Sequence, residues 1–147
     1  PRDVIYVRTL LGAVQMLLNG TTTVVDFLYE APEITVETLE PVVQAYRDAG
    51  IRASVLLGVS DRTFLESLPV DRSRLGLAAA EAAPPSLARV LEVCESAVAA
   101  FHEPDGLVQI GMAPSAPQRC SDELLPLVST ASYLASVDGD AAHIAAN

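Results

Sequence analysis

The sequence predicts an α/β fold built around a parallel β-sheet. Segments with helical spacing of apolar residues alternate with short β-branched or apolar runs that begin near residues 22, 52, 108 and 141. Strands joined by crossover helices form parallel sheets, either in a doubly wound domain or in part of a barrel. The chain has 147 residues, of which 50% are hydrophobic. This length and composition suffice for one ordinary core and exclude disorder over most of the chain.

The first helix and the first strand are indicated by residue spacing and by a glycine. In residues 4–18 the apolar side chains recur at helical spacing, and Asn19 and Gly20 follow as a signal for the end of a helix. Residues 22–28 are rich in threonine and valine, so we expect a strand that is buried in the sheet.

The second helix and the second strand follow a proline break. Either Thr35 or Thr38 can cap this helix, and Gly50 is expected to end it. Its apolar stripe consists of Leu39, Val42, Val43 and Tyr46. Residues 51–57 predict the next strand, which Gly58 is expected to close.

The remainder of the chain repeats this order after an irregular segment. A short helical turn is expected at residues 63–68, and a longer helix begins after Ser86, a favourable N-cap residue. Residues 107–112 predict a third strand. Ser121 is expected to cap a fourth helix, and residues 141–145 could form a short last strand.

The composition excludes several classes of partner. The chain has 19 acidic and 9 basic residues, no lysine, and a net charge of −10. Such a surface repels nucleic-acid phosphates and anionic membranes, and the lack of lysine excludes P-loop and Schiff-base chemistry. No segment is apolar enough to span a bilayer, and none has the pattern of a signal peptide. Cys94 and Cys120 lack CxxC spacing, which favours a reducing compartment, so we expect a cytoplasmic protein.

Candidate functional residues lie where the predicted strands end, because parallel α/β folds place their sites there. Asp26 and Tyr29 stand at the end of the first strand; Asp26 is either a site carboxylate or an acid that fixes a loop. Residues 60–62 either line a pocket or begin the short helix as a capped turn. Ser115 and Gln118 follow the third strand in a loop stiffened by two prolines, where they can face a ligand. No catalytic residue is assigned, because no Gly-x-Ser-x-Gly elbow or Ser–His–Asp set is found.

The two histidines, His102 and His143, do not suggest a complete metal site. His102 ends the third predicted helix, where a cation suits the helix dipole, so a structural role is expected. His143 lies in or beside the last predicted strand and has no second histidine at ligand spacing. A zinc site needs three or four convergent ligands, which this chain alone does not offer.

Three segments of the chain resemble the amidohydrolase superfamily. They are residues 20–26 (GTTTVVD), 45–53 (AYRDAGIRA) and 113–125 (APSAPQRCSDELL). Their order and spacing are also those of the family, and the resemblance runs from about residue 4 to residue 125. The chain is most similar to the cytosine-deaminase-like branch, which includes triazine hydrolases and guanine deaminase.

The resemblance implies a (β/α)8 TIM barrel in which a divalent metal, zinc or iron, activates water to attack a C–N bond, as in deaminases and amidases. Residues 1–147 would form a single incomplete segment of such a barrel, roughly its strands two to four with their helices. Residues 141–145 are the candidate for strand five, but residues 126–147 match the family poorly. The family's His-x-His pair would precede Pro1 and its last ligands would follow Asn147. We therefore expect the isolated chain to bind no metal and to be inactive.

The resemblance also implies roles for individual residues. Ser115 stands where the family often has a histidine that contacts the substrate. His143 is the candidate metal ligand, but Ala146 then occupies the position of an expected glutamate. The residues expected to contact a small-molecule substrate in the intact parent are Ser115, Gln118, Asp26 and Tyr29.

Two function hypotheses result. The chain is either a segment of a metal-dependent hydrolase or a non-catalytic remnant that retains only βα packing and serves as an association module. A receiver-type binding domain is disfavoured, because it needs a clustered acidic pair and a lysine. The open edges of a short parallel sheet also predict self-association.

Overall fold

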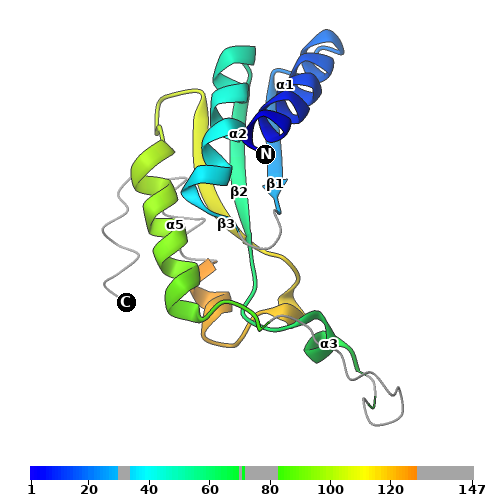
Figure 1. Cartoon of the computed structure of the whole chain (residues 1–147), viewed down its shortest axis with the longest axis vertical. Helices are drawn as coiled ribbons and strands as arrows, with labels where there is room; N and C mark the ends of the chain where they lie inside the picture. Colours follow the sequence, from blue (N-terminus) through cyan, green and yellow to red (C-terminus); the bar gives the residue numbers. More distant parts are fainter. Residues whose placement is uncertain (30–33, 70, 72–82, 129–147) are drawn as a thin grey trace.

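The part of the chain that the structure describes contains three parallel strands, with helices before and between them (Figure 1). The computed structural model describes residues 1–29, 34–69, 71 and 83–128. The elements in chain order are helix α1 (Arg2–Leu18), strand β1 (Thr23–Leu28), helix α2 (Val36–Ala49), strand β2 (Arg52–Val59), helix α3 (Phe64–Ser67), helix α5 (Leu87–Phe101), strand β3 (Val108–Pro114) and the 3-10 helix η1 (Pro117–Arg119). The strand expected at residues 141–145 lies outside the described residues.

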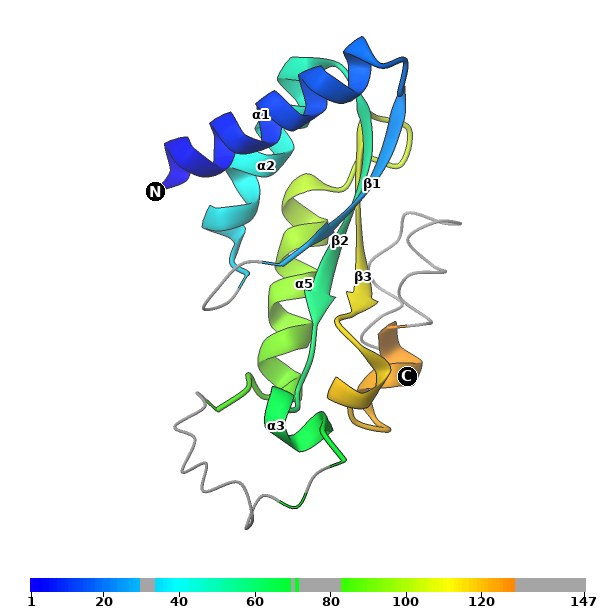
Figure 2. The ribbon, with the colours of Figure 1, turned by 90° about the vertical axis from the view of Figure 1, so that its right-hand side faces the viewer.

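All the long helices lie on the same face of the sheet. Strand β2 is in the middle, between β1 and β3, and both pairings are parallel. Figure 2 shows α1, α2 and α5 together on one side of these strands. A doubly wound sheet carries helices on both faces, whereas a barrel carries them on its outer face only. The described elements therefore have the architecture of a barrel segment.

Helix α1 ends as the sequence predicts. Gly20 has a φ of 84°, in the left-handed region that glycine adopts without steric cost. Its N–H donates to Leu17 O at 2.9 Å, and Thr21 N–H donates to Met16 O at 3.0 Å. This pair of bonds is a Schellman motif, which satisfies the last carbonyl groups of the helix and turns the chain into β1.

Helix α2 uses both of the threonines that were alternative caps. Thr35 is the N-cap residue, and its hydroxyl accepts a hydrogen bond from Thr38 N–H while the Thr38 hydroxyl accepts one from Thr35 N–H. This reciprocal arrangement is a capping box. Gly50 ends the helix with a φ of 72°. The predicted apolar stripe is buried, and it consists of Leu39, Val42, Val43 and Tyr46.

The prediction of a buried strand is only half right for β1. Its side chains alternate, so Val24 and Leu28 are buried toward the helices, whereas Val25 is 70% exposed and Phe27 is 46% exposed. The reason is that all the long helices cover the same face of the sheet. The run of β-branched residues hides this alternation in the sequence, because both faces of β1 carry apolar side chains.

Strands β2 and β3 each extend two residues beyond their predicted ends. Gly58 does not close β2; it lies within the strand, which continues to Val59. A Cβ atom on Gly58 would lie 2.9 Å from Phe27 Cζ and 3.0 Å from Leu28 O. Glycine is therefore required here by the close approach of β1, and the strand does not end at it.

The Ser86 cap is confirmed, because Ser86 Oγ accepts from Arg89 N–H at the start of α5. The short helix α3 is capped by Thr63, which forms a capping box with Glu66, and not by residues 60–62. Ser121 Oγ accepts from Leu124 N–H at 3.1 Å. Residues 124–128 are helical, after a turn at residues 122–123.

Candidate functional site

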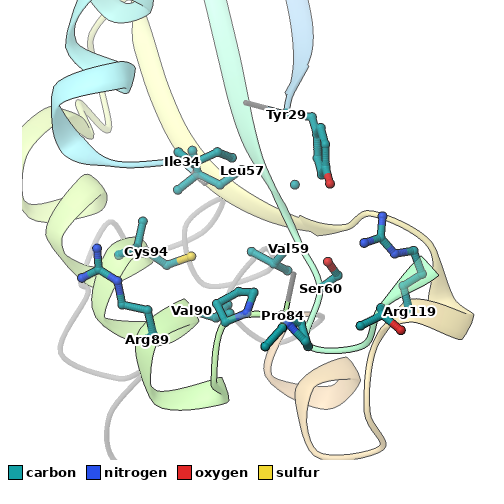
Figure 3. Close-up of a pocket in the computed structure, with 15 residues that line it drawn as sticks. Tyr29, Ile34, Leu57, Val59, Ser60, Pro84, Arg89, Val90, Cys94 and Arg119 are labelled. Carbon is teal, nitrogen blue, oxygen red and sulfur yellow. The ribbon is translucent and has the colours of Figure 1, made fainter. Parts of the chain in front are cut away.

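A cavity of about 260 Å³ lies at the carboxyl ends of the strands. Figure 3 shows that it extends around the end of β2. Tyr29 after β1, Ser60 after β2 and Arg119 of η1 line one side, and Val90 and Cys94 of α5 lie on the other. Residues from all three strand ends therefore meet at one cavity, as expected for the site of a parallel α/β fold.

Hydrogen bonds hold the loops after β2 and β3 together. Ser115 N–H donates to Val59 O at 2.8 Å, which continues the pairing of β3 with β2 beyond the strand ends. Further along, Asp61 N–H donates to Arg119 O at 3.2 Å, and Asp61 Oδ1 accepts from Ser121 N–H at 2.7 Å. These hydrogen bonds join the two loops into one wall of the cavity. Asp61 contributes to these bonds through its N–H and its carboxylate, whereas Thr63 caps the short helix α3.

The four predicted substrate contacts do not all reach this cavity. Tyr29 lines it. Ser115 and Gln118 are not among its described lining residues, and Gln118 is exposed. Asp26 lines a second cavity of about 300 Å³, to which α1, β1 and Tyr46 of α2 contribute, and Tyr29 lines this one as well. Substrate contact by these four residues stays a prediction.

Ser115 nevertheless has an unusual environment. Its hydroxyl oxygen is buried and has no hydrogen-bond partner among the residues that the structure describes. A buried hydroxyl without a partner costs about 1–3 kcal/mol, so a plain structural loop rarely retains one. The Ser115 hydroxyl therefore has hydrogen-bonding capacity that no described residue uses.

Asp26 is held by a specific partner on the helix side of β1. The Tyr46 hydroxyl donates to Asp26 Oδ2 at 2.7 Å. Burial and this hydrogen bond raise the pKa of Tyr46. The Asp26 carboxylate thus has a structural partner, but it links β1 to α2 and does not fix a loop; a role as a site carboxylate stays a prediction.

Burial also determines the chemistry of the cavity wall. Burial, with a smaller contribution from Glu95, raises the pKa of Cys94 to about 12. A thiol in this state is protonated at neutral pH and is neither a good nucleophile nor a good metal ligand. Cys94 therefore contributes apolar surface to the cavity.

His102 contacts the backbone of β3 from the end of α5. Its Nδ1 lies 3.0 Å from Ile110 N, which donates to it, and 3.2 Å from Ile110 O. The ring thus links the end of the helix to the strand. The interaction of a charged ring with the helix dipole stays a prediction.

The described residues do not fit a metal centre. No group of three or more histidine, cysteine, aspartate or glutamate residues among them could hold a metal ion. The candidate ligand His143 lies outside the described residues. That the chain itself binds no metal stays a prediction. The described residues likewise include no helix with the length and hydropathy needed to cross a membrane.

Sequence reasoning did not single out Arg119 as a residue of the cavity. Arg119 belongs to a strand-end loop that the sequence analysis did identify. The position of its backbone depends on hydrogen bonds that its carbonyl oxygen accepts from Asp61 N–H and Arg62 N–H, which are distant in sequence. The sequence signal that could have identified Arg119 as a cavity residue is its place in a loop that follows a predicted strand.

The chain is a barrel segment whose strand ends converge on one cavity, and comparison with known proteins gives its family. The model of the amidohydrolase family matches residues 1–144. This chain therefore belongs to the amidohydrolase family. A search of curated proteins finds no match.

Solved structures with a similar fold include triazine hydrolases. One is a triazine hydrolase from Arthrobacter aurescens modified for expression in E. coli, with a TM-score of 0.73 and 23% identity over 93% of this chain. Another is a mutant atrazine chlorohydrolase from Arthrobacter aurescens complexed with zinc and atraton, with a TM-score of 0.69 and 24% identity over 94% of this chain. At this level of identity the similarity shows the fold. The chain spans 29% of the length of each of these two proteins.

Proposed function

We propose that this chain is the substrate-holding segment of a metal-dependent amidohydrolase that acts on C–N bonds, of the deaminase or amidase type, with water as the nucleophile. Residues 1–147 form a single incomplete barrel segment in this proposal. Family membership supports hydrolysis, and the short span of the chain relative to the solved structures supports a segment. We further propose that the protein is cytoplasmic and that its partner is a small molecule, because a net charge of −10 disfavours nucleic acid.

The observation that carries the proposal is that residues after all three strands line one cavity, and that hydrogen bonds join the loops after β2 and β3. Tyr29, Ser60 and Arg119 come from three separate segments and line the same cavity. The hydrogen bonds between the loops after β2 and β3 hold that wall before any substrate binds. A rigid wall with polar groups orients a small molecule.

The residues of this chain have binding and orienting roles in the proposal. The Ser115 hydroxyl supplies a neutral hydrogen bond, and it does not carry protons as a histidine would. Because the described residues do not fit a metal, no step of the reaction is assigned to a metal on this chain. The isolated chain is expected to be inactive for the same reason.

A second candidate function is that of an association module, and a specific surface favours it. Helix α1 exposes apolar side chains at spacings of three and four residues, the pattern of a helix–helix seam. They are Val4, Val7, Leu11, Val14 and Leu18. A chain that uses this surface to bind another copy needs no catalytic site.

The two candidates are separated by the coding DNA and by one assay. Translation of the flanking DNA in all frames should reveal a His-x-His pair upstream and further ligands downstream. The protein encoded by that longer frame, loaded with zinc, should release ammonia from amide or amidine substrates. Flanking frames without these ligands, or a longer protein that hydrolyses none of them, would favour the association module.

A further inference from the structure

The cavity at the strand ends is positively charged in an acidic chain. Its described lining residues include two arginines, Arg89 and Arg119, and neither aspartate nor glutamate. The chain as a whole has a net charge of −10. The described lining thus carries basic but no acidic side chains in an acidic molecule, a composition that favours an anion.

The two arginines differ in their partners. Arg89 donates from Nη1 to Glu92 Oε2 at 3.0 Å and lies on the α5 side of the cavity (Figure 3). Arg119 makes no ion pair with a described residue, and its buried Nε has no hydrogen-bond partner among them. Arg119 as a whole is half-buried, and a buried N–H group without a partner is costly. Arg119 is therefore the charge that a ligand would compensate.

The Arg119 side chain points into a space that two hydroxyl groups also reach. Figure 3 shows the hydroxyls of Tyr29 and Ser60 on the same side of β2 as the Arg119 guanidinium. The three side chains follow three different strands, so the fold itself brings them together. They offer one cation and two hydroxyl donors at one end of the cavity.

We propose that Arg119, Ser60 and Tyr29 form a subsite for a carboxylate group of the substrate. A planar guanidinium binds a carboxylate through two parallel hydrogen bonds, and hydroxyl groups donate to the remaining lone pairs of the same oxygens. The apolar part of the molecule lies along the remainder of the cavity wall. The inference rests on the proposed function only in assigning the carboxylate to a substrate.

The backbone holds Arg119 in position before a ligand arrives. Its carbonyl oxygen accepts from Asp61 N–H at 3.2 Å and from Arg62 N–H at 3.1 Å. Its own N–H donates to Ala116 O at 2.9 Å. These bonds fix the backbone from which the cation projects, so binding of an anion has to order only the side chain, which favours affinity.

The test compares benzoate with benzamide by isothermal titration calorimetry on the intact 147-residue chain. Benzoate joins a carboxylate to an apolar ring, and benzamide is a neutral molecule of nearly the same shape. We expect benzoate to bind at least about tenfold more tightly, and Arg119→Gln to remove this preference. Arg119→Lys keeps the charge but lacks the planar pair of N–H donors, so this variant should keep only part of the preference for benzoate.

The matched control is Arg52→Gln, which removes the same charge from an exposed residue at the start of β2, the opposite end of the sheet. It should leave benzoate affinity unchanged, and circular dichroism should show that every variant is folded. Equal binding of the two probes, no binding of either, or the same loss in Arg52→Gln and Arg119→Gln would overturn the proposal. Because the titration needs neither metal nor turnover, it can fail while the hydrolase function stands, and it can succeed in a chain that hydrolyses nothing.

Discussion

The hydroxyl of Tyr46 on α2 donates a 2.7 Å hydrogen bond to the carboxylate of Asp26 on β1. The two residues are 20 positions apart in the sequence. This bond joins the helix layer to the first strand of the sheet next to the second cavity. It also gives the carboxylate on the helix-facing side of β1 a hydrogen-bond donor.

Replacement of Tyr46 by phenylalanine should destabilise the fold. A hydrogen bond to a charged group contributes about 1.5–3 kcal/mol, so the free energy of unfolding measured in urea should fall by that amount. The matched control is Tyr6→Phe, which removes a 2.7 Å bond to Asp48 on the exposed surface. Its effect should be much smaller, because solvent replaces an exposed bond. Equal effects of the two substitutions would contradict a specific role for the Tyr46–Asp26 pair.

The same pair gives the stability a pH dependence. The pKa of Tyr46 is raised above its usual value of 10.0, so the folded state keeps this proton more tightly than the unfolded state. The resulting stabilisation is complete below about pH 10 and is lost as the pH rises through the folded-state pKa. Unfolding curves at pH 8 and pH 11 should show a larger loss for the unmodified chain than for Tyr46→Phe. The opposite order would contradict the assignment.

Two glycine-to-alanine substitutions should have opposite effects. Gly58→Ala places a Cβ atom 2.9 Å from Phe27 Cζ and 3.0 Å from Leu28 O, so it should destabilise the chain by about 1–3 kcal/mol. Gly12→Ala meets nothing within 4 Å inside α1 and should stabilise it by about 0.5–1 kcal/mol. Melting temperatures from circular dichroism would show both. A neutral Gly58→Ala would mean that the Phe27 ring and the Leu28 carbonyl group move aside without cost.

Ser115→Ala should affect substrate binding more than stability. The hydroxyl has no partner among the described residues, so its removal should leave the free energy of unfolding unchanged or slightly higher. In an active longer enzyme the substitution should raise KM more than it lowers kcat, by about two- to twelvefold for a neutral hydrogen bond of 0.5–1.5 kcal/mol. Ser121→Ala is the control, because it removes a helix cap and should cost about 1 kcal/mol of stability. An unchanged kcat/KM for Ser115→Ala would show that the loop faces away from the substrate.

The isolated chain should self-associate through the exposed stripe on α1. The double variant Val7→Glu, Leu11→Glu places charge in the middle of that stripe, where both side chains are more than half exposed. Light scattering should give a lower mass for it than for the unmodified chain. Gln15→Glu adds charge at an exposed position beside the stripe and should leave the mass unchanged. A monodisperse monomer before any substitution would contradict the prediction.

Purified and dialysed chain should contain no stoichiometric metal. The physical reason is that the described residues offer no set of three convergent ligands. Elemental analysis for zinc and iron would test this directly. One tightly held ion per chain would contradict it and would point to residues outside the described ranges.

The elements were predictable because local chemistry determines them. Gly20 and Gly50 end helices through a positive φ, and Thr35 and Ser86 begin helices through side-chain caps, all within a few residues of sequence. The exposed face of β1 was not predictable, because Val25 is as apolar as its buried neighbours. Exposure there depends on which face the helices cover, and that is a property of the whole layer.

The candidate site was predictable in location but not in its contacts. The strand-end rule singled out Tyr29, which lines the cavity, and the loop of Ser115, which also contains Arg119; substrate contact by Tyr29 and Ser115 stays a prediction. It could not give the direction of Arg119, because two backbone bonds from Asp61 and Arg62 fix that loop across a long sequence separation. Contacts of this kind arise only when the chain folds.

The bond between His102 and Ile110 limits how this sheet can grow. At the start of β3, Ile110 N–H donates to His102 Nδ1, and Val108 O accepts from Glu103 N–H at 3.0 Å. Both backbone groups are therefore already used by the turn that precedes the strand. A further strand added beyond β3 has to begin its ladder after Ile110, displaced along its neighbour toward the carboxyl end. Such a stagger tilts successive strands, and an accumulating tilt is what allows a flat ribbon of strands to close into a cylinder.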